Sequence, residues 1–354
     1  MIAVAGSSGK TTTKEMLASV LKQRWRVYKS GENRNDRVHM RKHRHGIKSH
    51  HRAVVLEFGM HGRGNLRRSC HIIQPNMAIL TMIGTAHIGN FGGSVEALIK
   101  AKSDIVQHMK PTGTLFINAD DANSQALIYG DFEGKVIKVG IKNKSDYLAG
   151  NIAYSGRGMK SDVTLNGTNH RFFIPISGEH NVYNALFAIA AADQLGFTPS
   201  QIKKGLANYH RPPHRLRTYC LKRGTRLVDD TYNANPNLMK AAINVLAHIG
   251  LGRNIAVLGN MSELGRYIKG HQEVGEHLVN KRIFRLLTYG KKARRIGIAA
   301  VGHGFPAHKV QYSSSRKKVH GRLRKFIGRG TTILVKGSHD QHMYKTVRYL
   351  KRIG

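Results

Sequence analysis

Cysteine, tryptophan and acidic residues are scarce in this 354-residue chain, and what is missing excludes several classes of protein. Two cysteines, Cys70 and Cys220, are too few for a disulfide framework and have no metal-ligand spacing. No apolar run approaches the length of a membrane span, and no charged-then-apolar leader precedes the first apolar segment. We therefore expect a cytoplasmic protein without a membrane span, and the length suggests two or three domains.

The shortage of acidic residues leaves a large positive charge. Lys and Arg total 58 against 20 Asp and Glu, so the formal net charge is +38, with 21 His besides. This balance predicts salt-sensitive attraction to nucleic acid or anionic membranes. The bases are spread along the chain, and the densest stretch, residues 33–52, has almost no aromatic side chain for base stacking. We favour a solvated basic surface with non-specific polyanion binding over a dedicated nucleic-acid groove.

Histidines gather in the same basic stretch and raise the question of a metal site. They are His39, His43, His45, His50 and His51. Their spacing matches no common set of metal ligands, so no metal is assigned to them.

The first twelve residues carry the most specific local pattern. Residues 2–5 form a short apolar run typical of a buried strand, and a helix with one apolar face is predicted to begin at Lys10. Backbone N–H groups at such a helix start bind phosphate, Lys10 adds a positive charge, and a threonine hydroxyl can hold Mg²⁺. Gly6 and Gly9 are separated by two residues, where the usual P-loop has four. The predicted nucleotide loop comprises Gly6, Ser7, Ser8, Gly9, Lys10, Thr11 and Thr12.

Further apolar runs alternate with helical patterns and end in polar residues. Glu57 lies near the end of one run, His87 follows a second, and Asn118 closes a third. The alternation predicts a parallel, doubly wound α/β sheet, in which ligands bind beyond the carboxyl ends of the strands. An acid and an imidazole at that edge suit Mg²⁺. The alternative is a purely structural acid and a capping histidine.

The second half of the chain repeats the alternation. Residues 136–176 predict an antiparallel edge or subsheet, and an alanine-rich helix follows with polar residues grouped at its start. Residues 211–216 contain two prolines and predict a hinge. Beyond it, strands and helices alternate again, and polar clusters follow the strands at 229–236, 259–260 and 336–338. We predict a second, Rossmann-like α/β domain.

Motifs along the whole chain match, in order, those of one enzyme family. They are Gly-Ser-Ser-Gly-Lys-Thr-Thr at 6–12, Leu-Glu-Phe-Gly-Met at 56–60, Gly-Thr-Ala-His at 84–87, Ala-Lys at 101–102, Gly-Glu-His-Asn-Val-Tyr-Asn-Ala at 178–185, Asp-Asp-Thr-Tyr-Asn-Ala-Asn-Pro at 229–236, Val-Leu-Gly-Asn-Met-Ser-Glu-Leu-Gly at 257–265 and Val-Lys-Gly-Ser at 335–338. The chain resembles the Mur ligase family, most closely its branch that adds D-alanyl-D-alanine. This resemblance implies a central P-loop-type ATPase domain at 1–212 and a C-terminal domain at 213–354.

The resemblance also implies a reaction. Such enzymes are ATP-dependent amide ligases of peptidoglycan precursor synthesis that act through an acyl-phosphate. The implied substrates are UDP-N-acetylmuramoyl-tripeptide and D-alanyl-D-alanine, with ATP and Mg²⁺ as cofactors. Chemistry of this kind needs charge neutralisation and alignment more than a protein base. We expect the enzyme to be a monomer.

Residue roles follow from matched positions. The resemblance assigns catalysis to Lys10, His87 and Lys102, the last as a carbamylated lysine that helps to organise a second Mg²⁺. It assigns metal binding to Thr11, Glu57, His87 and Lys102. On the nucleotide it places His180 and Asn184 at the adenine side, Arg215 at the phosphates and Asp230 at the ribose. The implied substrate residues are Asn33, Asn35, Asn233, Asn235 and Lys336.

The chain also departs from the family. Family members have an N-terminal domain that holds the UDP group, and this chain opens at the loop strand, so we expect retained ATP binding with weak ligation. His39 and Arg41 stand where the family's substrate loop has Gly and Pro, Asn260 replaces an Asp, and His339 replaces an Arg. Two alternatives remain: another Mur-type amide ligase, and an inactive P-loop protein that binds nucleic acid or other polyanions.

Overall fold

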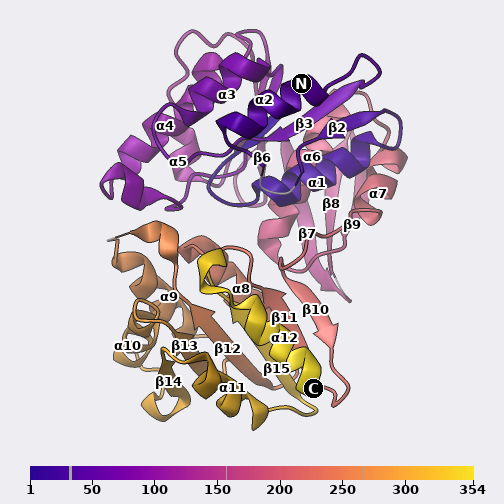
Figure 1. The fold of residues 1–354 in the computed structure, drawn as a ribbon. Coiled ribbons are helices and arrows are strands. Elements are labelled where there is room, and N and C mark those ends of the chain that lie inside the picture. The colour runs from indigo at the N-terminus through magenta and orange to yellow at the C-terminus, as the bar shows by residue number, and fades with distance from the viewer. Residues whose placement is uncertain (32–33, 157, 266) are drawn as a thin grey trace. The chain divides into compact units, whose positions relative to one another are not determined.

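The chain divides into two compact α/β units. The computed structural model describes residues 1–31, 34–156, 158–265 and 267–354, and its units are Met1–Arg211 and Pro212–Gly354 (Figure 1). The strand order of each unit confirms the predicted α/β class. The assignment of residues 1–212 and 213–354 as ATP-binding and C-terminal domains stays a prediction. Among the helices of the described ranges, none has the length and apolarity to span a bilayer.

The first unit is built on a nine-stranded sheet of order β2-β3-β1-β4-β5-β6-β7-β8-β9. Its strands are β1 (Ile2–Ala5), β2 (Val27–Lys29), β3 (Ala53–Glu57), β4 (Met77–Leu80), β5 (Thr114–Asn118), β6 (Lys135–Gly140), β7 (Tyr147–Ser155), β8 (Gly158–Leu165) and β9 (Thr168–Ile174). Neighbours from β2 to β7 pair in parallel, and β7, β8 and β9 pair antiparallel. The predicted antiparallel part therefore begins at β7, because β6 still pairs in parallel on both sides.

Helices complete the first unit. They are α1 (Lys10–Leu21), α2 (Arg37–Gly46), α3 (Asn65–Ile73), α4 (Val95–His108), α5 (Ala122–Gln125), α6 (Glu179–Gln194) and α7 (Pro199–Ala207). The central strands β1, β3 and β4 are buried along their whole length, as expected of apolar strands inside a parallel sheet. Helix α1 lies in the core beside α6 and α7. Gly205 of α7 approaches so closely that an added Cβ would lie 2.3 Å from the Cα of Val20.

The second unit has a six-stranded sheet of order β10-β11-β15-β12-β13-β14. Its elements are β10 (Arg217–Cys220), β11 (Arg226–Asp230), α8 (Pro236–Ile249), β12 (Arg253–Gly259), α9 (Lys269–Val279), β13 (Arg285–Tyr289), α10 (Arg294–Gly302), β14 (Val310–Ser313), α11 (Arg316–Arg324), β15 (Thr331–Lys336) and α12 (Tyr344–Ile353). All pairs are parallel except β10 with β11, and the sequence did not predict β10. The expected Rossmann-like alternation is confirmed.

Candidate active site

The loop between β1 and α1 requires glycine at two positions. Gly6 and Gly9 have φ angles of 134° and 86°, a backbone region that side chains disfavour. A Cβ on Gly6 would lie 2.0 Å from Thr81 Oγ1, and one on Gly9 would lie 2.3 Å from Asn184 Oδ1. Lys10 begins α1, and its Nζ donates a hydrogen bond to the Gly6 carbonyl at 2.9 Å. The lysine ammonium therefore lies over the loop.

The same loop is anchored to the segment that follows β4. Ser7 donates twice, from its backbone N–H to Met82 O at 2.8 Å and from its hydroxyl to Gly84 O at 2.9 Å. Thr81 Oγ1 donates to Ser8 O at 2.5 Å. These bonds fix the loop before any ligand is bound. They also join the two sequence motifs at 6–12 and 84–87, as the sheet-edge argument predicts.

Glu57 connects three elements at this edge. Its Oε2 accepts from Thr11 Oγ1 at 2.7 Å, and its Oε1 accepts from Asn35 Nδ2 at 2.8 Å. Its backbone N–H donates to Ser30 Oγ at 2.9 Å. The carboxylate is 3% exposed. The structure thus brings together Thr11 and Glu57, predicted for metal binding, and Asn35, predicted for substrate.

His87 has an unusual backbone and a neutral ring. Its φ is 62°, a left-handed conformation, just before a short 3₁₀ turn. Burial, together with the nearby charges of Lys10, His61 and Lys102, lowers the pKa of His87 to about 3. The ring of His61 meets it edge-on with 4.9 Å between centroids. The imidazole is therefore uncharged at neutral pH and can act as a ligand. Sequence reasoning missed His61.

Lys102 is fully buried on α4. Burial, helped by the charge of Lys10 and opposed by Asp121, lowers its pKa to about 7. Asp121 accepts hydrogen bonds from Ile83 N at 2.7 Å and Ser124 Oγ at 2.5 Å, and burial raises its own pKa. A lysine with this pKa is partly unprotonated at neutral pH, as a nucleophilic amine must be.

The donor set fits Mg²⁺ only together with ligands from outside the protein. In the part of the chain that the structure describes, no group of three His, Cys, Asp or Glu side chains is placed to hold a metal. Mg²⁺ is commonly held by one or two carboxylates, with phosphate oxygens and water completing its octahedron. Glu57 and the Thr11 hydroxyl supply oxygen donors beside the phosphate loop. These two residues suit such a site.

Lys14, a buried lysine that the sequence analysis did not single out, contacts the segment that holds Glu57. Lys14 has no exposed side-chain surface, donates to Ser30 O at 2.6 Å and pairs with Glu15 at 2.9 Å. Lys29 also bonds to Glu15. Burial alone would raise the pKa of Glu15, but Lys14 and Lys29 outweigh it and lower that pKa. Ser30 in turn receives the Glu57 N–H, so Lys14 positions Glu57 indirectly.

Asn184 on α6 lies against the loop helix. Its Oδ1 accepts from Thr13 Oγ1 at 3.2 Å, and its Nδ2 donates to Asn181 Oδ1 at 3.0 Å. Asn181 also bonds the neighbouring His180 ring at 3.0 Å. The sequence grouped these three polar residues, and the structure places Asn184 beside Gly9. The adenine-side role of His180 and Asn184 stays a prediction.

The second unit gathers its own polar cluster at the ends of β11 and β15. Asp230 and Lys336 are register partners, and their side chains pair at 2.5 Å. Lys336 also donates to Asn233 O at 2.8 Å, and Asp230 Oδ1 accepts from Leu216 N at 3.1 Å. Burial lowers the pKa of Lys336, and Asp230 opposes that change. Predicted ribose and substrate residues therefore lie together here.

Other predicted residues of this unit have local roles. The Arg215 guanidinium lies 4.2 Å from the centroid of the Tyr232 ring. Asn235 caps α8 by accepting from Leu238 N at 2.9 Å, and Asn233 Oδ1 accepts from Ala234 N. Their roles toward phosphate and substrate stay predictions. Asn33 lies outside the described residues.

Comparisons with known proteins agree with these motifs. The Mur ligase middle domain matches residues 4–192, and the Mur ligase glutamate ligase domain matches residues 214–339. A UDP-N-acetylmuramoyl-tripeptide–D-alanyl-D-alanine ligase of Bacillus subtilis (strain 168) is 32% identical over 352 residues, covering 99% of this chain and 75% of that protein. A crystal structure of MurF from Acinetobacter baumannii superposes with a TM-score of 0.91 at 29% identity, covering 99% of this chain and 76% of that one.

A third similarity concerns the fold alone. The crystal structure of MurF ligase from Thermotoga maritima in complex with ADP has a TM-score of 0.86 at 23% identity. It covers 99% of this chain and 79% of that one.

Proposed function

Because this chain belongs to the Mur ligase family, we propose that it is an ATP-dependent ligase that joins D-alanyl-D-alanine to UDP-N-acetylmuramoyl-tripeptide. The relative with that name is similar over nearly the whole chain. The observation that carries the proposal is the pairing of Thr11 with Glu57 directly beneath the Gly6–Thr12 loop. The reaction consumes ATP, so the cytoplasm is the proposed location.

The loop binds the phosphates of ATP in this proposal. Backbone N–H groups at the start of α1 point toward an anion, and the helix dipole favours negative charge there. The Lys10 ammonium, which donates to the Gly6 carbonyl, also stabilises charge on the transferred γ-phosphoryl group. The anchored glycines let the backbone approach the ligand closely. An ADP-bound relative of the same fold supports this assignment.

Thr11, Glu57 and His87 would hold Mg²⁺, which when bound neutralises phosphate charge and aligns oxygens for in-line transfer. Asn35 and Ser30 keep the Glu57 carboxylate in place through its side chain and its backbone N–H. Burial keeps His87 uncharged. The protein's contribution is thus orientation and charge balance.

Lys102 is proposed to react with CO₂. Its unprotonated Nζ forms a bond to the carbon of CO₂ and releases one proton, which converts the neutral amine into a carbamate anion. The low pKa of the buried amine favours this step. The negative charge of the product would be attracted to Lys10, whose positive charge lowers the pKa of the free amine.

One assay tests the function directly. Purified protein is given MgATP and the muramoyl tripeptide, with and without D-alanyl-D-alanine, and phosphate release is followed together with the mass of the product. We expect release that depends on both substrates and a product heavier by the dipeptide minus water. Phosphate release without amide formation in every substrate combination would contradict the proposal.

A further inference from the structure

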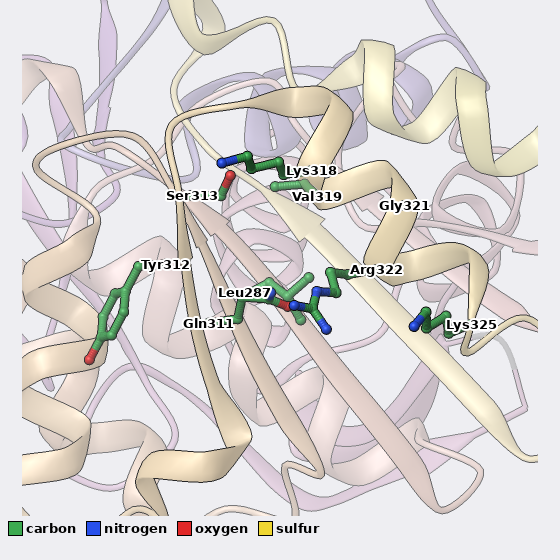
Figure 2. A pocket seen from close by; sticks show the side chains of 9 residues that line it. All are labelled: Leu287, Gln311, Tyr312, Ser313, Lys318, Val319, Gly321, Arg322 and Lys325. Atoms are coloured by element: carbon green, nitrogen blue, oxygen red, sulfur yellow. The ribbon is translucent and has the colours of Figure 1, made fainter.

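A cavity lies in the second unit, between strands β13 and β14 and helix α11. It has a volume of about 420 Å³, and its lining includes Leu287, Gln311, Ser313, Lys318, Val319, Arg322 and Lys325 (Figure 2). Leu287 and Val319 are buried and belong to the core, so they give the cavity an apolar floor. No residue of the candidate active site lines it. The volume is within the range of small-molecule sites.

Three cations follow one another along the wall of this cavity. Lys318, Arg322 and Lys325 are spaced by four and three positions, so they share one helical face. Seven residues of helix correspond to about 10 Å. In Figure 2 they lie in order along α11 and its end, and Ser313, Leu287 and Gln311 line the same cavity. All three are exposed.

No Asp or Glu side chain is among the residues that line the cavity beside these three cations. The sequence from His277 to His339 contains neither Asp nor Glu. A concave surface with one sign of charge focuses its field on a ligand. The turn that leads into α11 is ordered as well, because Ser313 Oγ donates to Ser315 O at 2.9 Å and accepts from Ser315 N at 3.1 Å. The lining of the cavity therefore carries three cations and no carboxylate, and one of its turns is held by hydrogen bonds.

From this arrangement we propose that the cavity binds a linear oligophosphate, either free or as the phosphate chain of a nucleotide. A row of three cations matches several linked anionic groups better than one isolated anion. Arginine at the centre of the row offers paired donors that fit phosphate oxygens. The cavity volume of about 420 Å³ limits the ligand to a small molecule, which favours an oligophosphate over a nucleic-acid strand.

The test measures binding of inorganic tripolyphosphate by calorimetry. The full chain carries Lys10→Ala, which weakens the proposed ATP loop and leaves the cavity as the remaining site. In that background, a cavity variant combines Lys318→Gln, Arg322→Gln and Lys325→Gln. A matched control combines Lys345→Gln, Arg348→Gln and Arg352→Gln, three exposed cations of α12 that span seven positions and line no part of the cavity.

We expect the cavity variant to bind tripolyphosphate at least about tenfold more weakly, because three charge-assisted contacts are lost. The control loses the same total charge and should change by less than about threefold. Arg322→Gln alone should weaken binding about threefold, which keeps the test open if the triple variant folds poorly. Equal weakening in the cavity and control variants would overturn the proposal, because diffuse surface charge would then explain binding.

Two further ligands separate the sources of phosphate. A nucleoside triphosphate that binds more tightly than tripolyphosphate, and loses that affinity in the cavity variant, identifies a nucleotide as the ligand. Equal affinity for the two identifies a free oligophosphate. A single-stranded DNA oligonucleotide is the third probe. If DNA binding depends on the cavity cations while tripolyphosphate binding does not, this face is a nucleic-acid surface and the proposal is wrong.

Discussion

The carboxyl edge of the first sheet and the cavity beside α11 are both cationic, but they hold their cations differently. At the edge, Lys14 and Lys102 are fully buried, and Lys14 has a carbonyl and a carboxylate as partners. In the cavity, Lys318, Arg322 and Lys325 are exposed on one helix face. Burial among hydrogen-bonding partners fixes a charge in space, whereas exposure leaves it hydrated and mobile. We therefore expect single substitutions to lower turnover or stability strongly at the sheet edge and only slightly at the cavity.

The largest effect is expected at the loop. Lys10→Ala removes the cation over Gly6, which the proposed mechanism places at the transferred phosphoryl group. Loss of one such stabilising group typically lowers kcat by about 10²–10³. Steady-state phosphate release and ATP binding would measure it. An unchanged kcat and ATP affinity in this variant would remove the loop from the mechanism.

A buried lysine outside the loop should matter for folding. Lys14→Met deletes the partner of Glu15 and Ser30 and leaves a partly buried carboxylate with Lys29 alone. Breaking a buried pair costs about 3–5 kcal/mol of unfolding free energy, somewhat less here because Lys29 remains. Lys318→Met is the exposed control, expected within about 0.5 kcal/mol. Urea unfolding measures both, and similar losses in the two variants would erase the contrast between the regions.

Lys102→Ala should lower turnover about 100-fold with little loss of ATP binding, if a carbamate at this position orients the reacting groups. Short-chain carboxylic acids should partly restore activity by placing an anion in the space left by the side chain. Lys100→Ala, on the same helix, is the control for added acid. Full activity of Lys102→Ala without any added acid would show that the modified lysine is not needed.

The smallest effect concerns a buried group that carries no charge. His271 accepts from Met261 N at 3.2 Å, and burial, with Lys292 and Arg295, lowers its pKa to about 4. His271 therefore binds a proton more readily in the unfolded chain than in the folded one. Its contribution lowers the free energy of unfolding as pH drops below about 6.5. Between pH 7 and pH 5.5, the free energy of unfolding should fall by about 1 kcal/mol because of this histidine. His271→Gln, which can keep the acceptor, should flatten that part of the pH profile of urea unfolding.

The sequence predicted most of the strands, and it placed Glu57 at the same sheet edge as the 6–12 loop, because both depend on local pattern. Apolar runs such as residues 53–57 form the buried strands, and polar residues at strand ends meet at one sheet edge. Helix α2 was missed because Val38 and Met40 are its only apolar residues apart from its final glycine, among arginines, histidines and a lysine. Its N-cap, Asp36, is visible only once the helix is known.

Tertiary contacts lay beyond such reasoning. Nothing in the sequence near Gly9 indicates that Asn184, far along the chain, would lie against it. Lys14 reads as one more surface base in a chain of net charge +38, and only packing shows that it is buried. Strand β10 has no signal of its own, because its pairing with β11 is what makes it a strand.

The burial of α1 keeps the phosphate loop in one conformation before a ligand binds. Its buried residues are Thr11, Thr12, Thr13, Lys14, Met16, Leu17, Ala18, Val20 and Leu21, whereas α2 buries only Met40 and His43. Amide protons of α1 should therefore exchange with solvent deuterium only when the whole unit opens, while those of α2 exchange through local fraying. The loop geometry is then as stable as the whole unit. The helix N-terminus is already formed when a ligand binds, so no binding energy is needed to order it.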